Sequence, residues 1–263
     1  MIERALAGAV IAGGIAVTAH WARALSPSGA IAATVVGTIA IAAGWGWGAL
    51  LIAYFVASVL VSRWGASYKA ARTAAIVAKG GVRDAWQVGA NGGVFALTAL
   101  GALGVVGSPH WWSIAGAGAL AAAAADTWST EIGTRVGGTP RSILSRRPVP
   151  AGTSGGVTLW GSVGAIAGGA FVAMVAVLCG WRVAHVAPIA VAGLVGAFAD
   201  SLLGAAVQSV NRCPACGTFT ERAVHDCGSP TVPASGWRWM TNDAVNCAAT
   251  VIGAATALAL AGG

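Results

Sequence analysis

Long apolar stretches separated by short polar segments dominate the sequence. This pattern predicts membrane helices at residues 4–22, 29–44, 48–63, 91–107, 111–131, 155–180, 184–209 and 242–261. The segments 29–44 and 48–63 are short for a span of about 20 residues, so they also fit a re-entrant or steeply packed hairpin. The first stretch lacks a clear small-residue cleavage site, and we interpret it as a membrane helix rather than a signal peptide.

Composition excludes a soluble protein. Hydrophobic residues make up 57% of the chain, charged residues only 9%, and the mean hydropathy is +0.76. Soluble domains carry about 25% charged residues. The 39 glycines suit membrane helices that pack backbone to backbone through small residues. We therefore expect an all-α fold: a polytopic membrane helix bundle of about seven to eight helices, forming one integral-membrane domain over residues 1–263.

The basic residues predict the orientation. All 15 Lys and Arg residues except Arg4 and Arg182 fall in alternate loops or at their edges. They are Arg23 in the first loop, Arg63, Lys69, Arg72, Lys79 and Arg83 before residue 91, Arg135, Arg141, Arg146 and Arg147 after the fifth helix, and Arg212, Arg222 and Arg238 before the last helix. The positive-inside rule places these loops in the cytoplasm and both termini outside. No nucleic-acid-binding motif accompanies the net charge of +7, so we expect no nucleic-acid partner.

Similar short sequence motifs recur at equivalent positions in the predicted topology. Helices that leave the cytoplasmic side begin with "PSGAIAAT" at 27, "NGGVFALT" at 91, "SGGVTLWG" at 154 and, more loosely, "NDAVNCAA" at 242. Helices that return end with "AAADTWSTEIG" or "GAFADSLLGAAVQ". The pattern predicts repeated helical hairpins, Gly-rich at the entrance and carrying Asp near the exit. Chance recurrence of glycine pairs in a Gly-rich chain is the alternative.

Four carboxylates approach the cytoplasmic ends of apolar segments. The alanine run 121–125 is typical of a lipid-facing helix, yet Asp126 and Glu131 follow it, and Asp200 and Asp243 lie in later segments. An unpaired carboxylate in hydrocarbon is costly, so such residues normally face the bundle interior and have a function. Hard cations such as Mg²⁺ take carboxylate and phosphate oxygens, which predicts a metal–phosphate site. Pairing with a loop arginine is the structural alternative.

Spacing refines these roles. Asp200, Gly204 and Gln208 are four residues apart and share a helical face. Asn242 and Asn246 also share a face beside Asp243 at the start of the last helix. Asp126 and Glu131 do not align on an ideal helix, so joint metal binding would require the helix to loosen near Gly133.

Glycine-rich helix entrances and nearby arginines predict phosphate binding. Helix N-termini offer free N–H groups and a positive dipole end to an anion. The sequence contains no P-loop, so a nucleotide would be held differently. The candidate phosphate- and nucleotide-binding residues are Asn91, Gly92, Gly93, Arg146, Arg147, Ser154, Gly155, Gly156, Ser201, Gly204, Gln208, Asn242 and Asn246. Arg141 stands near this set in "RSILSRR".

Clustered cysteines in the cytoplasmic loop 210–240 predict a zinc knuckle. Cys213, Cys216, His225 and Cys227 form the pattern C-x2-C-x8-H-x-C, which suits a structural Cys3His zinc site in a reducing compartment. A redox pair or idle thiols are the alternatives. Cys179 and Cys247 fall in apolar segments, where we expect small buried side chains.

These motifs together resemble the transmembrane protein 19 / phytyl-phosphate kinase family (domain of unknown function 92). The words that carry the resemblance are "NGGV", "ADTWSTEIG", "GTSGGVT", "GAFADSLLGA", "CPACG" and "TNDAVN", and they cover the chain from about residue 26. The resemblance implies a membrane kinase that converts an isoprenyl monophosphate of the phytyl or geranylgeranyl kind to its diphosphate. It also implies CTP or ATP as co-substrate and Mg²⁺ as cofactor, by distant relation to enzymes such as phytol kinase and dolichol kinase.

The residues themselves agree with that expectation. Asp126 and Asp200 would hold Mg²⁺ on the nucleotide phosphates, with Glu131 and Asp243 as further ligands or as a base. The expected partners are an isoprenyl-phosphate lipid, a nucleotide and the bilayer, with the active site on the cytoplasmic face. Two alternatives stay open: a lipid-alcohol kinase or cytidylyltransferase of the same chemistry, and a secondary transporter, whose acids would lie nearer the membrane midplane.

Overall fold

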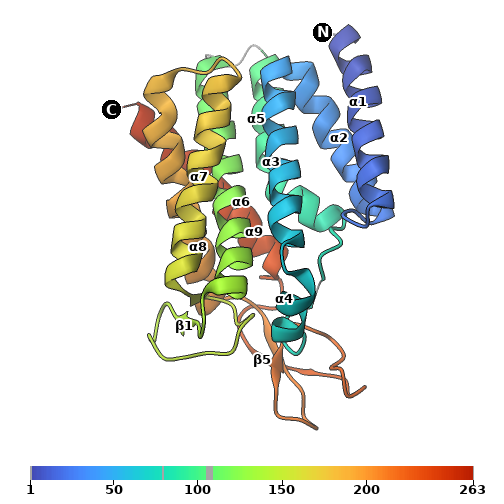
Figure 1. Ribbon diagram of the computed structural model, residues 1–263, viewed down its shortest axis with the longest axis vertical. Helices are drawn as coiled ribbons and strands as arrows, with labels where there is room; N and C mark the ends of the chain where they lie inside the picture. The colour runs from blue at the N-terminus through green and yellow to red at the C-terminus, as the bar shows by residue number, and fades with distance from the viewer. Residues whose placement is uncertain (1, 79, 105–108, 263) are drawn as a thin grey trace.

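The computed structural model describes residues 2–78, 80–104 and 109–262 and contains nine α-helices within them (Figure 1). The helices are α1 (Ile2–Trp21), α2 (Pro27–Ala43), α3 (Trp45–Arg63), α4 (Ala66–Thr73), α5 (Ala85–Leu103), α6 (Pro109–Val136), α7 (Leu159–Leu178), α8 (Val186–Ala206), preceded by the 3₁₀ turn η1 (Val183–His185), and α9 (Asn242–Ala261). Each of the eight apolar segments corresponds to one long helix, and the short α4 is an addition that the hydropathy pattern did not predict.

The expected all-α membrane bundle is confirmed. Five helical segments are long and apolar enough to cross a membrane: α1, α3, α7, α9 and the segment 183–206 that contains α8. Helix α2 is apolar but shorter. Gly44 alone separates α2 from α3, and the two form an antiparallel hairpin. Helix α6 lies in the interior of the bundle, whereas α5 packs on α2, α6 and α9 and leaves Leu97 and Leu100 exposed on its outer face.

Helix α6 is the centre of the bundle, and this corrects the expectation that its alanine run faces lipid. Residues 121–125 are at most 2% exposed. Helices α5, α7, α8 and α9 all pack against α6. A side chain at Gly168 of α7 would come within 2.7 Å of the Ala124 carbonyl, and one at Gly253 of α9 within 2.6 Å of the Gly118 carbonyl. The alanines are small because the neighbouring backbones approach α6 this closely.

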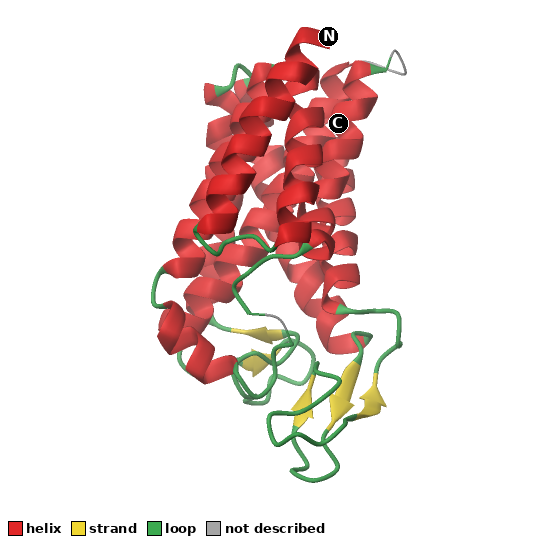
Figure 2. Ribbon diagram, turned by 90° about the vertical axis from the view of Figure 1, so that its right-hand side faces the viewer, coloured by secondary structure: helices red, strands yellow, loops and turns green. Residues whose placement is uncertain are grey.

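The connections between α3 and α5, between α6 and α7 and between α8 and α9 lie toward one end of the molecule, opposite both termini, and the α1–α2 turn that carries Arg23 lies nearer its middle (Figures 1 and 2). Arg4 in the first turn of α1 and Arg182 before η1 lie toward the other end, as the charge pattern predicts. Lys79, which the same pattern included, lies outside the described residues. We call the basic end the loop end.

Two of the four helix starts differ from the predicted repeat. Helix α5 begins at Ala85, where Asp84 and Gln87 form a capping box, so the Gly-rich segment at 91 lies inside the helix. Helix α7 begins at Leu159, capped by the Thr158 hydroxyl, so the segment 154–156 precedes it. Capping residues set these starts more strongly than the glycines. The other two starts agree with the prediction: Ser26 caps α2 and Thr241 caps α9.

Short strands and α4 cover the loop end (Figure 2). Strands β1 (Arg141–Ser142) and β2 (Gly156–Val157) pair antiparallel, with Arg141 opposite Val157. Strands β3 (Val210–Arg212), β4 (Phe219–Thr220) and β5 (Val232–Ser235) form an antiparallel sheet in the order β4-β3-β5, with Arg212 opposite both Phe219 and Val232. These elements close the bundle over the polar ends of its helices.

Lys69 connects α4 to two helices of the bundle. Its ammonium group pairs with Glu131 of α6 and donates to the backbone carbonyls of Val61 (3.1 Å) and Ser62 (2.8 Å) at the end of α3. The Lys69 side chain is 8% exposed and that of Glu131 is 24% exposed. The pair therefore positions α4 beside the loop end of α6.

The topology predicts a labelling result. Leu144 in the loop after α6 is 56% exposed, and Val183 at the opposite end is 71% exposed. In intact cells, an impermeant thiol reagent should label Val183→Cys and leave Leu144→Cys protected, after subtraction of the parent chain's labelling. The loops 64–90 and 210–240 should be protected in the same way. External labelling of Leu144→Cys would reverse the predicted orientation.

The Lys69–Glu131 pair predicts a stability coupling. Removing one partner of a buried pair costs about 3–5 kcal/mol, and the partial exposure of Glu131 reduces this to roughly 2–3 kcal/mol for Glu131→Gln. Lys69→Met should cost more because it also loses two carbonyl contacts. Thermal unfolding in detergent should find the double variant more stable than the sum of the two single effects predicts. Strict additivity would show that the pair contributes no coupling.

Candidate functional site

A large polar cavity lies at the loop end, between the helix ends and the segments that cover them. Its volume is about 830 Å³, within the range of about 300–1,000 Å³ that is usual for small-molecule sites. Five of the eight acidic residues of the chain line it: Asp126, Glu131, Asp200, Glu221 and Asp243. The described basic residues in its wall are Lys69, Arg83 and Arg238. The acidic surplus favours a cation in this space, and we call it the acidic cavity.

Asp126 and Asp200 lie side by side where α6 packs against α8. Their carboxyl groups interact directly, and both line the acidic cavity. The Oδ1 atom of Asp200 is buried and has no hydrogen-bond partner. Two adjacent carboxylates repel each other unless they share a proton or bind a common cation. The pair therefore has the donor chemistry of a divalent-cation site.

Glu131 does not join this pair. Helix α6 continues without a break to Val136, so the loosening near Gly133 that joint binding required does not occur. Glu131 instead pairs with Lys69, as the structural alternative for a buried acid anticipated, although with a lysine in place of an arginine. It still lines the acidic cavity. Its neighbour is a cation that the protein itself supplies, which makes it a weaker candidate for a metal ligand.

The polar residues of α8 and α9 reach the same cavity. Asp200, Ser201, Gly204 and Gln208 line it, although α8 ends at Ala206 and Gln208 lies beyond the helix. A side chain at Gly204 would come within 3.3 Å of the Gly155 amide nitrogen, so this glycine lets a loop approach α8. The start of α9 contributes Asn242, Asp243 and Asn246. The structure brings this set to one cavity, although Gln208 does not lie on the helical face that the spacing predicted.

The Gly-rich segments differ in their positions. Ser154, Gly155 and Gly156 line the acidic cavity from the loop before α7, and Gly155 has a φ of +74°, which favours glycine. Asn91 also lines it, but its side chain donates to the Gln87 carbonyl within α5 (2.9 Å). Gly92 and Gly93 are absent from the lining of this cavity. A phosphate cradle at the helix start is therefore wrong for residues 91–93, because α5 starts six residues earlier.

Arg146 and Arg147 do not reach the acidic cavity. They lie exposed on the turn that follows β1, which closes through hydrogen bonds from the Arg146 amide to the Ser142 carbonyl (2.8 Å) and from the Ser142 amide to the Arg147 carbonyl (2.9 Å). Neither residue lines the cavity. The turn sets their direction, which spacing along the chain could not reveal. Lys69, Arg83 and Arg238 take their place, and in the sequence these had served only to predict orientation.

Glu221 is a cavity residue that sequence reasoning missed. Its carboxylate accepts hydrogen bonds from Gln208 Nε2 (2.6 Å), Ser154 Oγ (3.1 Å) and the Ala78 amide (3.5 Å). Burial raises the pKa of Glu221, and the charge of Asp243 adds to this, while the three donors oppose it. Glu221 follows the zinc-type motif in a polar loop, so nothing local distinguished it from a solvated side chain.

Cys213, Cys216, His225 and Cys227 converge at the edge of the three-stranded sheet. One potential ligand atom from each lies within 4.8 Å of all the others. The Cys213 and Cys227 sulfurs are 3.6 Å apart, and His225 Nδ1 is 3.2 Å from the Cys227 sulfur. Tetrahedral zinc with Zn–S bonds of about 2.3 Å separates two sulfurs by about 3.8 Å. The four residues therefore fit the donor set and spacing of a zinc site.

The loop that carries this cluster docks on the segment before α5. The Thr220 hydroxyl and the Glu221 amide both donate to the Ile76 carbonyl (3.1 and 2.9 Å), and Arg222 Nε donates to the Val77 carbonyl (2.9 Å). Thr220 is fully buried. These contacts fix the side chain of Glu221 in the wall of the acidic cavity.

Comparisons with known proteins agree with this architecture. Residues 10–254 match the family described as "Integral membrane protein DUF92". Protein PGR of Arabidopsis thaliana is 30% identical over 92% of this chain and 91% of its own length. An uncharacterized membrane protein of Methanocaldococcus jannaschii is 31% identical over 70% of this chain and 74% of its own, and one of Synechocystis sp. is 26% identical over 90% and 82%. No solved structure gives a significant match. The chain thus belongs to the DUF92 family of integral membrane proteins.

Proposed function

We propose that this membrane protein is a kinase that converts an isoprenyl monophosphate to its diphosphate with a nucleoside triphosphate, CTP or ATP, and Mg²⁺. The observation that carries the proposal is the contact between Asp126 and Asp200 in the wall of the acidic cavity. Mg²⁺ sites in phosphoryl-transfer enzymes commonly combine one or two carboxylates with substrate phosphates. The buried, unpartnered Oδ1 of Asp200 fits a cation that completes its coordination.

The lining residues can be divided by chemistry between metal and phosphate. Asp126 and Asp200 would hold Mg²⁺, which when bound neutralises phosphate charge during transfer. Arg83 and Arg238 supply positive charge to phosphate oxygens, whereas Glu131, Val61 and Ser62 take the three donors of Lys69. Gly155 and Gly156 leave backbone accessible near α8, and Asn242 and Asn246 add amide groups at the start of α9. This division supports binding of a triphosphate beside a second phosphate.

The reaction needs little acid–base help from the protein. An oxygen of the lipid phosphate attacks the γ-phosphorus, the bond to the β–γ bridging oxygen breaks, and the nucleoside diphosphate leaves with that electron pair. A phosphate monoester is largely doubly ionised at neutral pH, so no proton has to be removed first. Positioning and charge neutralisation therefore supply most of the rate.

The Cys3His cluster has a structural part in this proposal. Bound zinc would fix the loop 210–240, which places Glu221 in the cavity wall through its contacts with Ile76. Glu221 then orients Gln208 and Ser154 through the hydrogen bonds that it accepts. Zinc would thus act on the site through the loop rather than on the substrate.

A secondary transporter is the main alternative from another functional class. Transporter sites lie near the membrane midplane between inverted repeats. Here Asp126 and Asp200 lie in the halves of α6 and α8 nearest the loop end, and extramembrane segments form much of the cavity wall. That placement favours an enzyme. A lipid-alcohol kinase or a cytidylyltransferase uses the same groups, and only the choice of substrate separates them.

The kinase proposal predicts loss of turnover in Asp126→Asn and Asp200→Asn. Asn keeps the shape of Asp but loses the charge that binds Mg²⁺, so each variant should lower turnover roughly 10²-fold or more. The assay offers geranylgeranyl monophosphate with ATP, CTP, GTP or UTP, titrates Mg²⁺ and measures diphosphate product. Glu3→Gln, an exposed charge at the far end of α1, is the control and should keep parental turnover.

Two outcomes would contradict this proposal. Near-parental turnover and unchanged Mg²⁺ dependence in both Asp variants would make these carboxylates structural. Product from free isoprenyl alcohol but not from the monophosphate would identify an alcohol kinase instead. Each variant must remain monodisperse in detergent, which separates loss of chemistry from loss of fold.

The zinc proposal predicts close to one zinc ion per chain by elemental analysis of protein purified without chelator. Cys213→Ser and Cys227→Ser should lose the metal and expose the loop 210–240 to limited proteolysis. Cys247→Ser is the matched control, because Cys247 lies on α9 outside the cluster and should leave zinc content unchanged. Absence of zinc from the parent protein would exclude the site.

A further inference from the structure

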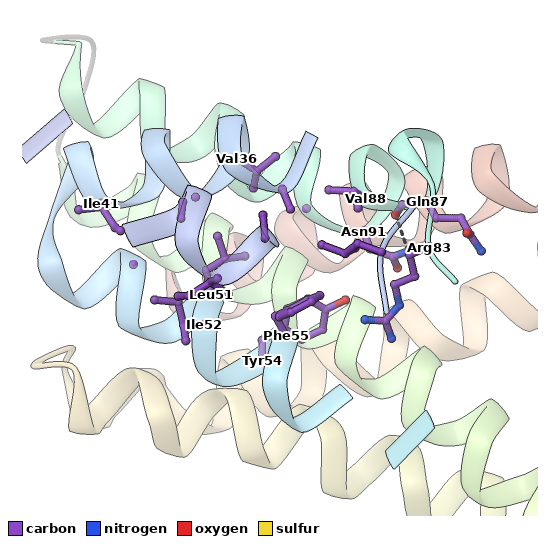
Figure 3. Close-up of a pocket in the computed structure, with 18 residues that line it drawn as sticks. Val36, Ile41, Leu51, Ile52, Tyr54, Phe55, Arg83, Gln87, Val88 and Asn91 are labelled. Atoms are coloured by element: carbon purple, nitrogen blue, oxygen red, sulfur yellow. Dashed lines mark hydrogen bonds between the residues drawn. The ribbon is translucent and has the colours of Figure 1, made fainter. Parts of the chain in front are cut away.

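A second, apolar cavity runs between α1, α2, α3 and α5 (Figure 3). At about 80 Å³ against about 830 Å³ for the acidic cavity, it is a narrow channel. Its walls are almost entirely aliphatic or aromatic, with polar side chains gathered at one end. We call it the apolar channel.

The polar end of the apolar channel is also the wall of the acidic cavity. Arg83, Gln87 and Asn91 line both spaces. Figure 3 shows these three residues grouped at one end of the channel and Ile41 toward the other. Tyr54 also lines the channel, and its hydroxyl lies within electrostatic range of both Arg83 and Asp126. An extended ligand in the channel would therefore present one end to the acidic cavity.

Arg83 is held at this junction by its backbone. The Arg83 amide donates to the Ala24 carbonyl (3.0 Å), and the Arg83 carbonyl accepts from the Ser26 amide (2.9 Å). A side chain at Gly29 would come within 2.2 Å of that carbonyl, so glycine is required where α2 begins. The Arg83 guanidinium makes only a long contact with Ser62 Oγ (3.5 Å), and among the described residues it forms no ion pair. It is free to bind an anion.

We propose that the apolar channel binds the hydrocarbon chain of the lipid substrate and that Arg83 binds its phosphate. The inference rests on the proposed function for the reaction, but the channel and its cationic mouth define the ligand independently as a single-chain lipid phosphate. Apolar walls exclude charged groups, and a guanidinium matches phosphate oxygens with two parallel donors. The head group then lies in the acidic cavity, beside Asp126 and Asp200.

The channel limits the chain that it can enclose. Its wall along α2 extends from Ala33 to Ile41, and eight residues of helix rise about 12 Å. At its far end Ile41 packs closely on Gly48, since a side chain at Gly48 would come within 2.4 Å of Ile41. One linear chain fits such a channel, whereas the two chains of a glycerophospholipid do not. Side chains along it therefore select chain length.

Opposite changes in channel length test this selection. Ile41→Phe should shorten the channel at its far end, and Ile52→Ala should enlarge it beyond Phe55. The matched control is Val35→Phe, which adds an aromatic ring at a 53% exposed position on the same helix. Equilibrium binding of geranyl, farnesyl and geranylgeranyl monophosphates to protein in nanodiscs, without nucleotide, is the measurement. Ile41→Phe should weaken geranylgeranyl monophosphate at least about tenfold relative to the geranyl compound, because only the longer chain reaches the far end.

The opposite effect expected for Ile52→Ala keeps this test decisive if Ile41→Phe fails to fold. Ile52→Ala should raise the affinity for geranylgeranyl monophosphate relative to the geranyl compound, and Val35→Phe should change neither. Equal effects on all three chain lengths in both channel variants would overturn the assignment of the channel.

The phosphate contact is tested by a charge removal. Arg83→Gln should weaken geranylgeranyl monophosphate roughly 10-fold to 100-fold and leave geranylgeraniol, which lacks the phosphate, within twofold of the parent. Arg182→Gln at the opposite end is the control. Equal loss for the alcohol and the phosphate, or no loss for either, would contradict a phosphate contact at Arg83.

These experiments distinguish failure of the channel assignment from failure of the kinase proposal, because binding and turnover are measured separately. If binding depends on chain length but no nucleotide yields the diphosphate, the channel assignment stands and the kinase proposal is rejected. If diphosphate forms but its chain-length preference is unchanged in Ile41→Phe and Ile52→Ala, the kinase proposal stands and the channel assignment is rejected. Tight binding of a two-chain phosphatidic acid probe that competes with the monophosphate would also reject the channel, because its width admits one chain.

Discussion

Close backbone packing around α6 is the constraint on which the rest of the structure depends. Side chains at Gly168 of α7 and Gly253 of α9 would come within 2.7 and 2.6 Å of α6 carbonyls, and one at Gly193 of α8 would come within 3.0 Å of the Ala121 carbonyl and 2.8 Å of Gly169. In a bilayer, helices gain nothing from burying apolar surface against each other, so association depends on close contact between small residues. The alanines and glycines therefore hold the helices of the bundle together.

That packing is also what brings the carboxylates together. Asp126 and Asp200 belong to different helices, and they meet because α6 and α8 approach closely along their small-residue faces. At the loop end, residues 152–156, α4 and the zinc-type loop form the other walls of the acidic cavity. The packed helices and the segments that cover their ends together enclose a polar space.

The two cavities suit the two parts of a lipid phosphate, its charged head group and its hydrocarbon chain. The acidic cavity has an excess of carboxylates over described cations, which suits a metal and phosphates. The apolar channel is aliphatic and ends at Arg83, which belongs to both. The α1–α2 turn fixes the backbone of Arg83, so the N-terminal hairpin contributes to the site without supplying a carboxylate. This gives a physical reason for the serine and glycine at the start of α2.

Composition and periodicity alone determined the membrane bundle, the common end of the basic loops, the four zinc-type ligands and the acids that approach one end. These follow from local properties: hydropathy, charge bias and ligand spacing within one loop. The tertiary structure decided which of those residues meet. It paired Glu131 with Lys69, turned Arg146 and Arg147 away, and brought Arg83 and Glu221 into the cavity. The capping residues Asp84 and Thr158 also set the helix starts, in place of the Gly-rich motifs that suggested starts at 91 and 154. Such partners are separated by many residues and joined by loops of irregular direction, so only the packing of helices around α6 specifies them.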